Sequence, residues 1–235
     1  MRALATLAEN AERAPHEIPS VAGDALPPAE EGYFASREVV SAAGVPMAEA
    51  RAARTAAEAR AAAEELGYPV ALKALASEHK SEAGVVLGIA DGEALEAAYR
   101  RLPAGGCSVE RMAPLESGVE LIVGMRRDPR FGPLLLVGLG GVYAEVFRDV
   151  AVALAPVDPE DAEELLRSLR CAPLLDGARG RPPLDVAAAA RAVSALSHLA
   201  ARAPWLAEVE VNPLLVTPDG VLGLDARLVL GTMER

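Results

Sequence analysis

The stretch GYPVALKAL (67–75) places a single lysine, Lys73, inside an apolar run that begins at a glycine. A short apolar run bounded by such a breaker is typical of a buried β-strand. Burying an ammonium group in such a strand costs free energy unless a counter-charge lies close to it. Lys73 is therefore either a cation that reaches a phosphate group or a lysine that extends from the edge of the strand into solvent.

The segment SEHKSEAG (77–84), which follows this strand, favours the phosphate interpretation. It brings Lys80, His79, two serines and Gly84 close to the end of the strand, and Lys73 and Lys80 are the only lysines among 23 basic residues. A loop histidine in this place can relay a proton or a phosphoryl group, or can be an ordinary solvated residue. The scarcity of lysine nevertheless makes both surviving lysines candidates for a functional role.

Composition excludes several classes of function. The chain has 235 residues and a net charge of −11, which argues against nucleic-acid binding. It has no apolar run long enough to span a membrane, and Glu9 and Glu12 are unlike the apolar core of a signal peptide. Cys107 and Cys171 are the only cysteines, which is too few for a disulfide framework or a four-cysteine zinc site. We expect a cytoplasmic protein.

The pattern of apolar residues and breakers predicts an α+β (α/β) fold with two lobes. We expect an N-terminal helix and linker at 1–28, a first lobe at 29–109 and a second lobe at 110–235. Thr55, Asp91, Asp158 and Asp185 are expected to cap helices. The predicted helices cover 35–43, 56–66, 92–102, 159–170 and 185–202. The predicted strands cover 69–75, 85–89, 108–112, 119–125, 133–138, 142–146, 207–216 and 221–225.

The glycine-rich segment GLGG (138–141) resembles part of a dinucleotide-binding fingerprint, but its context differs. That fingerprint needs a strand leading into a helix, whereas these glycines lie between predicted strands. Gly140 and Gly141 therefore allow either close backbone approach to a ligand or a bend in the chain.

The last predicted hairpin gives the most geometric clue. Along EVEVNPLLV (208–216) polar residues alternate with valines, so Asn212 shares a face with the two glutamates before it. A two-residue turn at Pro218-Asp219 puts Asn212 opposite Asp225, and a turn at Asp219-Gly220 makes them diagonal neighbours. A three-residue turn would put them on opposite faces. The oxygens of Asn212 and Asp225 are suited to Mg²⁺; the alternative is a polar sheet face open to solvent.

Several ordered motifs resemble the ATP-grasp subunit or domain of the ADP-forming acyl-CoA synthetases, relatives of succinyl-CoA synthetase. The resemblance runs from about residue 30 to the end of the chain, and residues 1–28 are similar to the connector of fused members. Its motifs are GYPVALKAL (67–75), HKSEAGVVLGI (79–89), VERM (109–112), GVELIVGMRRDPRFGPLLLVGLGGVYAEVFRDV (118–150), EVEVNPLLV (208–216) and GLDA (223–226).

The resemblance implies an ATP-grasp fold with the nucleotide between the two lobes. It implies that Lys73 contacts the ATP phosphates, that His79 helps to pass phosphate to or from a phosphohistidine on a partner, and that Asn212 and Asp225 hold Mg²⁺. Glu110 to Met112 are implied to form the hinge beside the adenine. The residues implied to contact ATP or ADP are Lys73, Lys80, Gly84, Glu110, Met112, Glu120, Gly140, Gly141 and Glu145.

Family members convert an acid, CoA and ATP into acyl-CoA, ADP and phosphate. The resemblance implies that this chain supplies the ATP and phosphohistidine half, in a hetero-oligomer with a CoA-binding subunit or domain. Two departures from the family pattern favour an alternative, a catalytically weakened nucleotide-sensing or structural module. Val85 stands where the family usually has a second glycine, and Ala153 stands where it tends to have an arginine that meets the transferring phosphate.

Overall fold

The computed structural model describes residues 27–29, 31–75, 84–141, 144–178 and 180–231. It divides into two compact units. One unit is Ala48–Pro114; the other combines Leu115–Arg235 with the stretch that ends at Met47. Each unit contains helices and an antiparallel sheet, as the α+β prediction requires. No helix in the described part of the chain is long and apolar enough to cross a membrane.

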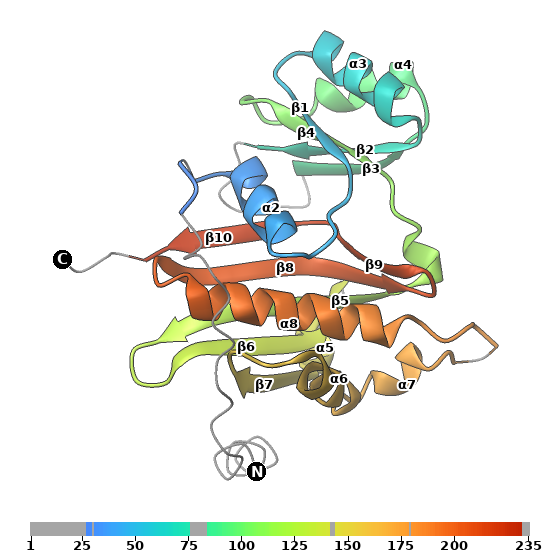
Figure 1. The fold of residues 1–235 in the computed structure, drawn as a ribbon. Coiled ribbons are helices and arrows are strands. Elements are labelled where there is room, and N and C mark those ends of the chain that lie inside the picture. Colours follow the sequence, from blue (N-terminus) through green and yellow to red (C-terminus); the bar gives the residue numbers. More distant parts are fainter. Residues whose placement is uncertain (1–26, 30, 76–83, 142–143, 179, 232–235) are drawn as a thin grey trace. The chain divides into compact units, whose positions relative to one another are not determined.

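The smaller unit is a four-stranded antiparallel sheet in the order β1-β4-β2-β3, with two helices on one face (Figure 1). Alternate side chains of the strands, among them Leu72 and Val109, meet Leu66 and Leu95 of the helices in one buried cluster. The elements are β1 (Ala50–Ala53), α3 (Ala56–Leu66), β2 (Val70–Ala74), β3 (Val85–Ile89), α4 (Gly92–Tyr99) and β4 (Cys107–Arg111).

The larger unit has a sheet in the order β10-β8-β5-β6-β7, with β9 also paired to β8. Helix α8 lies across one face of this sheet (Figure 1). The elements are α2 (Tyr33–Ala42), a 3-10 turn (Leu115–Ser117), β5 (Val119–Asp128), β6 (Gly132–Leu139), α5 (Ala144–Phe147), β7 (Val150–Leu154), α6 (Pro159–Arg167), α7 (Ala172–Leu175), α8 (Val186–Arg202), β8 (Leu206–Thr217), β9 (Gly220–Gly223) and β10 (Ala226–Leu230).

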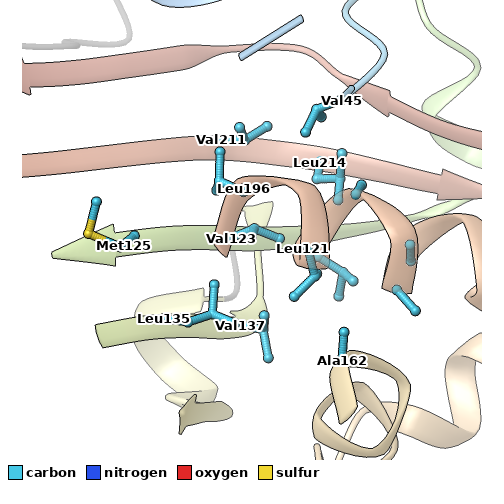
Figure 2. Packing of buried hydrophobic residues seen from close by; sticks show 14 of the residues in the cluster. Val45, Leu121, Val123, Met125, Leu135, Val137, Ala162, Leu196, Val211 and Leu214 are labelled. Atoms are coloured by element: carbon cyan, nitrogen blue, oxygen red, sulfur yellow. The ribbon is translucent and has the colours of Figure 1, made fainter. Parts of the chain in front are cut away.

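The core of the larger unit lies between this sheet and α8. Leu121, Val123 and Met125 of β5 point towards the helix, where they pack near Leu196 (Figure 2). Because successive residues of a strand point to opposite faces, the side chains between these core residues lie on the other face of the sheet. We call this second face, opposite α8, the outer face.

The predicted helix caps are confirmed at all four positions. The side chains of Thr55, Asp91, Asp158 and Asp185 each accept a hydrogen bond from the backbone N–H three residues later. This geometry satisfies one of the N–H groups that the first turn of a helix leaves without a backbone partner. Local sequence therefore determines where these helices begin.

Several elements differ from the sequence prediction. The strand predicted at 142–146 is wrong for its described part, because 144–147 form a short helix and the next strand begins at Val150. The chain turns at Gly141, which has φ 70°, and again at Arg148, which has φ 45°. Strands β1 and β10 were not predicted from the sequence; each lies at the edge of its sheet.

Candidate functional site

Lys73 lies on β2 beside a carboxylate from the neighbouring strand β4. Its Nζ is 2.9 Å from Oε2 of Glu110, and the two side chains are 15% and 4% exposed. Glu110 pairs with Ala71, two residues before Lys73, so both side chains lie on the sheet face that α3 and α4 leave uncovered. The counter-charge that a buried ammonium requires is therefore supplied by Glu110.

A serine lies directly opposite Lys73. Ser108 pairs with Lys73 across β2 and β4, and its side chain is fully buried. Its Oγ has no hydrogen-bond partner among the described residues. A buried hydroxyl without a partner costs about 1–3 kcal/mol, so this position is polar at the expense of stability. Sequence analysis missed Ser108, although a hydroxyl in the buried strand CSVER (107–111) is a signal that could have been noticed.

Of the other residues predicted to contact nucleotide in the smaller unit, some lie in the described part of the chain and some do not. Gly84 is buried and precedes β3, and Met112 follows β4, where its N–H donates to the carbonyl of Pro69 at 3.4 Å. His79 and Lys80 lie outside the described residues. The structure thus brings Lys73 and Glu110 together and leaves the role of the following loop as a prediction.

The turn of the last hairpin is the two-residue loop Pro218-Asp219, because Thr217 pairs with Gly220. Ala226 pairs with Val211 in the same register, so Asn212 and Asp225 lie opposite each other between these pairs. The backbone N–H of Asn212 donates to the carbonyl of Asp225 at 3.1 Å. The predicted juxtaposition is confirmed, with the turn on which it depended.

These two side chains have the donor chemistry of a small magnesium site. Nδ2 of Asn212 donates to Oε1 of Glu210 at 3.2 Å, which leaves its Oδ1 as an acceptor. Asp225 is 9% exposed and supplies a carboxylate on the outer face. The described residues contain no group of three or more histidines, cysteines or carboxylates that could hold a metal ion. Mg²⁺ fits such a pair, because it usually binds one or two protein groups and takes its remaining ligands from water and phosphate.

Glu120 and the glycines after β6 lie at the end of the outer face. The N–H of Gly140 donates to the carbonyl of Glu120 at 2.8 Å, and a Cβ at Gly140 would come within 2.7 Å of the Leu121 backbone. A Cβ at Gly141 would collide with the Glu120 carboxylate. Of the two interpretations left open for GLGG, this structure shows a bend packed tightly against β5. Glu145 lies in α5, but its side chain is outside the described part of the structure.

The two departures from the family pattern occupy different environments. Ala153 pairs with Leu135 and is 4% exposed within the core, so its side chain lies on the face opposite the one that carries Glu120. An arginine at this position would begin in the core instead of on the outer face. Val85 is opposite Lys73, and Arg148 is the only described non-glycine residue with a positive φ. Valine therefore causes no backbone strain at position 85.

Both cysteines are buried thiols without catalytic character. Burial raises the pKa of the Cys107 thiol to about 11. Burial and a hydrogen bond with Asp149 raise the pKa of the Cys171 thiol to about 12. Because the thiolate is the reactive form, neither residue is a nucleophile near neutral pH.

Comparisons with known proteins agree with this architecture. A family profile described as an ATP-grasp domain matches residues 32–230. Subunit beta of the ADP-forming acetate–CoA ligase I of Pyrococcus furiosus is 36% identical over 209 residues, which are 83% of this chain and 89% of that subunit. The ADP-forming acetate–CoA ligase I of Archaeoglobus fulgidus is 37% identical over 206 residues, but the matched part is only 30% of that protein.

Solved structures show the same relationship. The dinucleotide-forming acetyl-coenzyme A synthetase 1 of Candidatus Korarchaeum cryptofilum, in complex with coenzyme A and Ca-AMPCP, has a TM-score of 0.80 and 34% identity, covering 85% of this chain and 93% of that one. A structure of the same synthetase with coenzyme A and Mg-AMPPCP has a TM-score of 0.75 and 31% identity. In that structure a phosphohistidine segment points towards the nucleotide-binding site.

Proposed function

This chain belongs to the ATP-grasp family, and on that premise we propose that it is the ATP-binding component of an ADP-forming acyl-CoA synthetase. The observation that carries the proposal is the similarity to the Pyrococcus subunit beta, which extends over 83% of this chain and 89% of that subunit. In this role the chain binds Mg·ATP and exchanges a phosphoryl group with a histidine on a CoA-binding partner. The larger Archaeoglobus relative, of which the matched part is 30%, has room for such a partner in the same chain.

Lys73 is the residue proposed to meet the nucleotide phosphates. Its ammonium is a compact charge held at 2.9 Å by Glu110, on the uncovered face of the smaller unit's sheet. In this structure the Glu110 carboxylate is an anionic partner of the largely buried ammonium. A bound phosphate gives the ammonium a second anionic partner. The ammonium in turn stabilises the negative charge that develops on the phosphate during phosphoryl transfer.

Asn212 and Asp225 are proposed to hold Mg²⁺, which neutralises phosphate oxygens when it is bound. Glu120, Gly140 and Gly141 are proposed to line the nucleotide pocket at the end of the outer face. The remaining nucleotide contacts are proposed for Lys80, Gly84, Glu110, Met112 and Glu145. His79 is proposed to help the phosphoryl group pass to or from the partner's histidine.

The alternative, a nucleotide-sensing or structural module, loses one of its two supports. The arginine missing at position 153 would begin in the core, so its absence is not evidence that the outer face has lost a cation. Val85 remains a difference on the Lys73 side of the sheet. We also propose a cytoplasmic hetero-oligomer, since two buried free thiols fit a reducing compartment.

Calorimetric titration of the full chain with Mg·ATP tests nucleotide binding. Lys73→Met keeps most of the apolar stem and removes the charge, so we expect it to weaken ATP binding. Arg51→Met, which removes an exposed cation of the same unit, is the matched control and should bind like the wild type. Equal affinity of the Lys73→Met variant and the wild type would exclude the proposed phosphate contact.

Transfer of label from [γ-³²P]ATP to the CoA-binding partner tests the enzymatic role. We expect an acid-labile, base-stable label on a partner histidine, which requires Mg²⁺ and is lost in Lys73→Met. Binding of ATP without transfer to a partner that is competent with a known ATP-grasp subunit would instead support the sensing module.

A further inference from the structure

The proposed metal ligand Asp225 lies in a short interruption between β9 and β10. Leu224 and Asp225 belong to neither strand. Two backbone hydrogen bonds hold them to β8. The Leu224 N–H donates to the Pro213 carbonyl at 2.9 Å, and the backbone carbonyl of Asp225 accepts from the Asn212 N–H at 3.1 Å. The geometry of Asp225 therefore also depends on what holds the carbonyl of Leu224.

That carbonyl accepts a hydrogen bond from a buried arginine of helix α2. Arg37 is 5% exposed, and its Nη1 donates to the Leu224 oxygen at 3.1 Å. The same nitrogen is 3.1 Å from the hydroxyl of Tyr33, and the guanidinium lies 5.3 Å from the centre of the Tyr33 ring. A buried charge held by a ring, a hydroxyl and a carbonyl has little freedom to move.

We infer that Arg37 is a positioning residue for Asp225, and this inference rests on the proposed magnesium site. The Leu224 carbonyl belongs to the same planar peptide unit as the Asp225 nitrogen and Cα. A hydrogen bond to this carbonyl therefore fixes the plane from which the Asp225 side chain extends. Groups that orient a metal ligand from behind typically change metal affinity about 10–100-fold when they are removed.

A purely structural role for Arg37 is the competing explanation, because α2 also holds β10 elsewhere. The hydroxyl of Ser36 accepts a hydrogen bond from the Leu228 N–H at 3.2 Å, and Ser36 is also 5% exposed. Both residues therefore connect α2 by hydrogen bonds to the segment after β9, beside which the helix lies (Figure 1). Only the Arg37 bond reaches the peptide unit that leads into Asp225, so Ser36 provides a matched control.

The test measures ATP affinity of the full chain by calorimetry, once with excess MgCl₂ and once with EDTA. The ratio of the two affinities is the magnesium gain. We compare the wild type with Arg37→Met, which keeps the apolar stem, and with Ser36→Ala and Asp225→Asn. We expect Arg37→Met to reduce the gain about tenfold while the affinity in EDTA stays unchanged. We expect Ser36→Ala to keep the gain and Asp225→Asn to lose it.

Each outcome decides one of the two claims. If Asp225→Asn loses the gain and Arg37→Met keeps it, the positioning role is wrong and the magnesium site stands. If Arg37→Met and Ser36→Ala reduce the gain equally, α2 is a general clamp and the inference also fails. If Asp225→Asn keeps the gain, the proposed magnesium site is wrong, and the inference falls with it. Should Arg37→Met not fold, Arg37→Lys keeps a cation and a donor and is expected to show an intermediate gain.

Discussion

Replacing Glu110 by glutamine tests how the Lys73 ammonium is kept inside the sheet of the smaller unit. The Lys73 and Glu110 side chains are 15% and 4% exposed and 2.9 Å apart, so glutamine leaves a largely buried ammonium without its carboxylate. Removing one partner of a buried ion pair typically costs about 3–5 kcal/mol. Because Lys73 keeps some contact with solvent, we expect the free energy of unfolding to fall by about 3 kcal/mol, at the lower end of that range.

A double-mutant cycle separates the pair from its surroundings. The variants are Lys73→Met, Glu110→Gln and the double variant, each unfolded with urea at neutral pH. We expect a coupling energy of about 2 kcal/mol, because each single variant removes one charge of the pair whereas the double variant removes both.

The Arg51–Glu65 pair of the same unit is the control. Its N···O distance of 2.6 Å is shorter, but its side chains are 44% and 61% exposed. Solvent screening should make its coupling much smaller than that of Lys73–Glu110. If the shorter, exposed pair couples as strongly as the buried pair, the reasoning from burial is refuted.

Three further substitutions test other parts of the structure. Arg127 donates to the carbonyls of Ala200 and Ala203 at the end of α8 and to that of Leu206 at the start of β8, so Arg127→Ala should destabilise the chain by about 3 kcal/mol in urea unfolding. A change at the exposed neighbour Arg126 should have little effect. Burial tends to raise the pKa of Asp149, but hydrogen bonds from the N–H groups of Arg170 and Cys171 outweigh it and lower the pKa below 3.8. The carboxylate therefore stabilises the fold above its unfolded-state pKa and loses this effect as the pH falls through its folded-state pKa. The difference in melting temperature between the wild type and Asp149→Asn should accordingly disappear in acid. A difference that stays constant with pH would contradict this. Ser108→Ala removes a buried hydroxyl that has no partner among the described residues and should raise the free energy of unfolding by about 1 kcal/mol. A loss of stability would show that the hydroxyl has a partner in solution.

Much of the fold follows from short-range rules that the sequence displays directly. A cap such as Thr55 or Asp158 acts on an N–H three residues away, so it is visible without any knowledge of the tertiary structure. The edge strands β1 and β10 were missed because neither shows a long apolar run, and each is recognisable as a strand only through pairing with its neighbour. The helix at 144–147 was missed because its place depends on backbone turns at Gly141 and Arg148.

The candidate site divides in the same way. The sequence by itself placed Asn212 and Asp225 on one hairpin, and because the register of a hairpin is set by its turn it limited their pairing to a few registers. The structure selected the two-residue loop Pro218-Asp219 among the turns left open, which puts the two residues opposite each other. Only the tertiary structure decided that Glu110 neutralises Lys73, that Arg37 holds the peptide before Asp225, and that Ala153 faces the core. These contacts join segments far apart in the chain, so their geometry depends on how whole elements pack and on the small differences in burial that result.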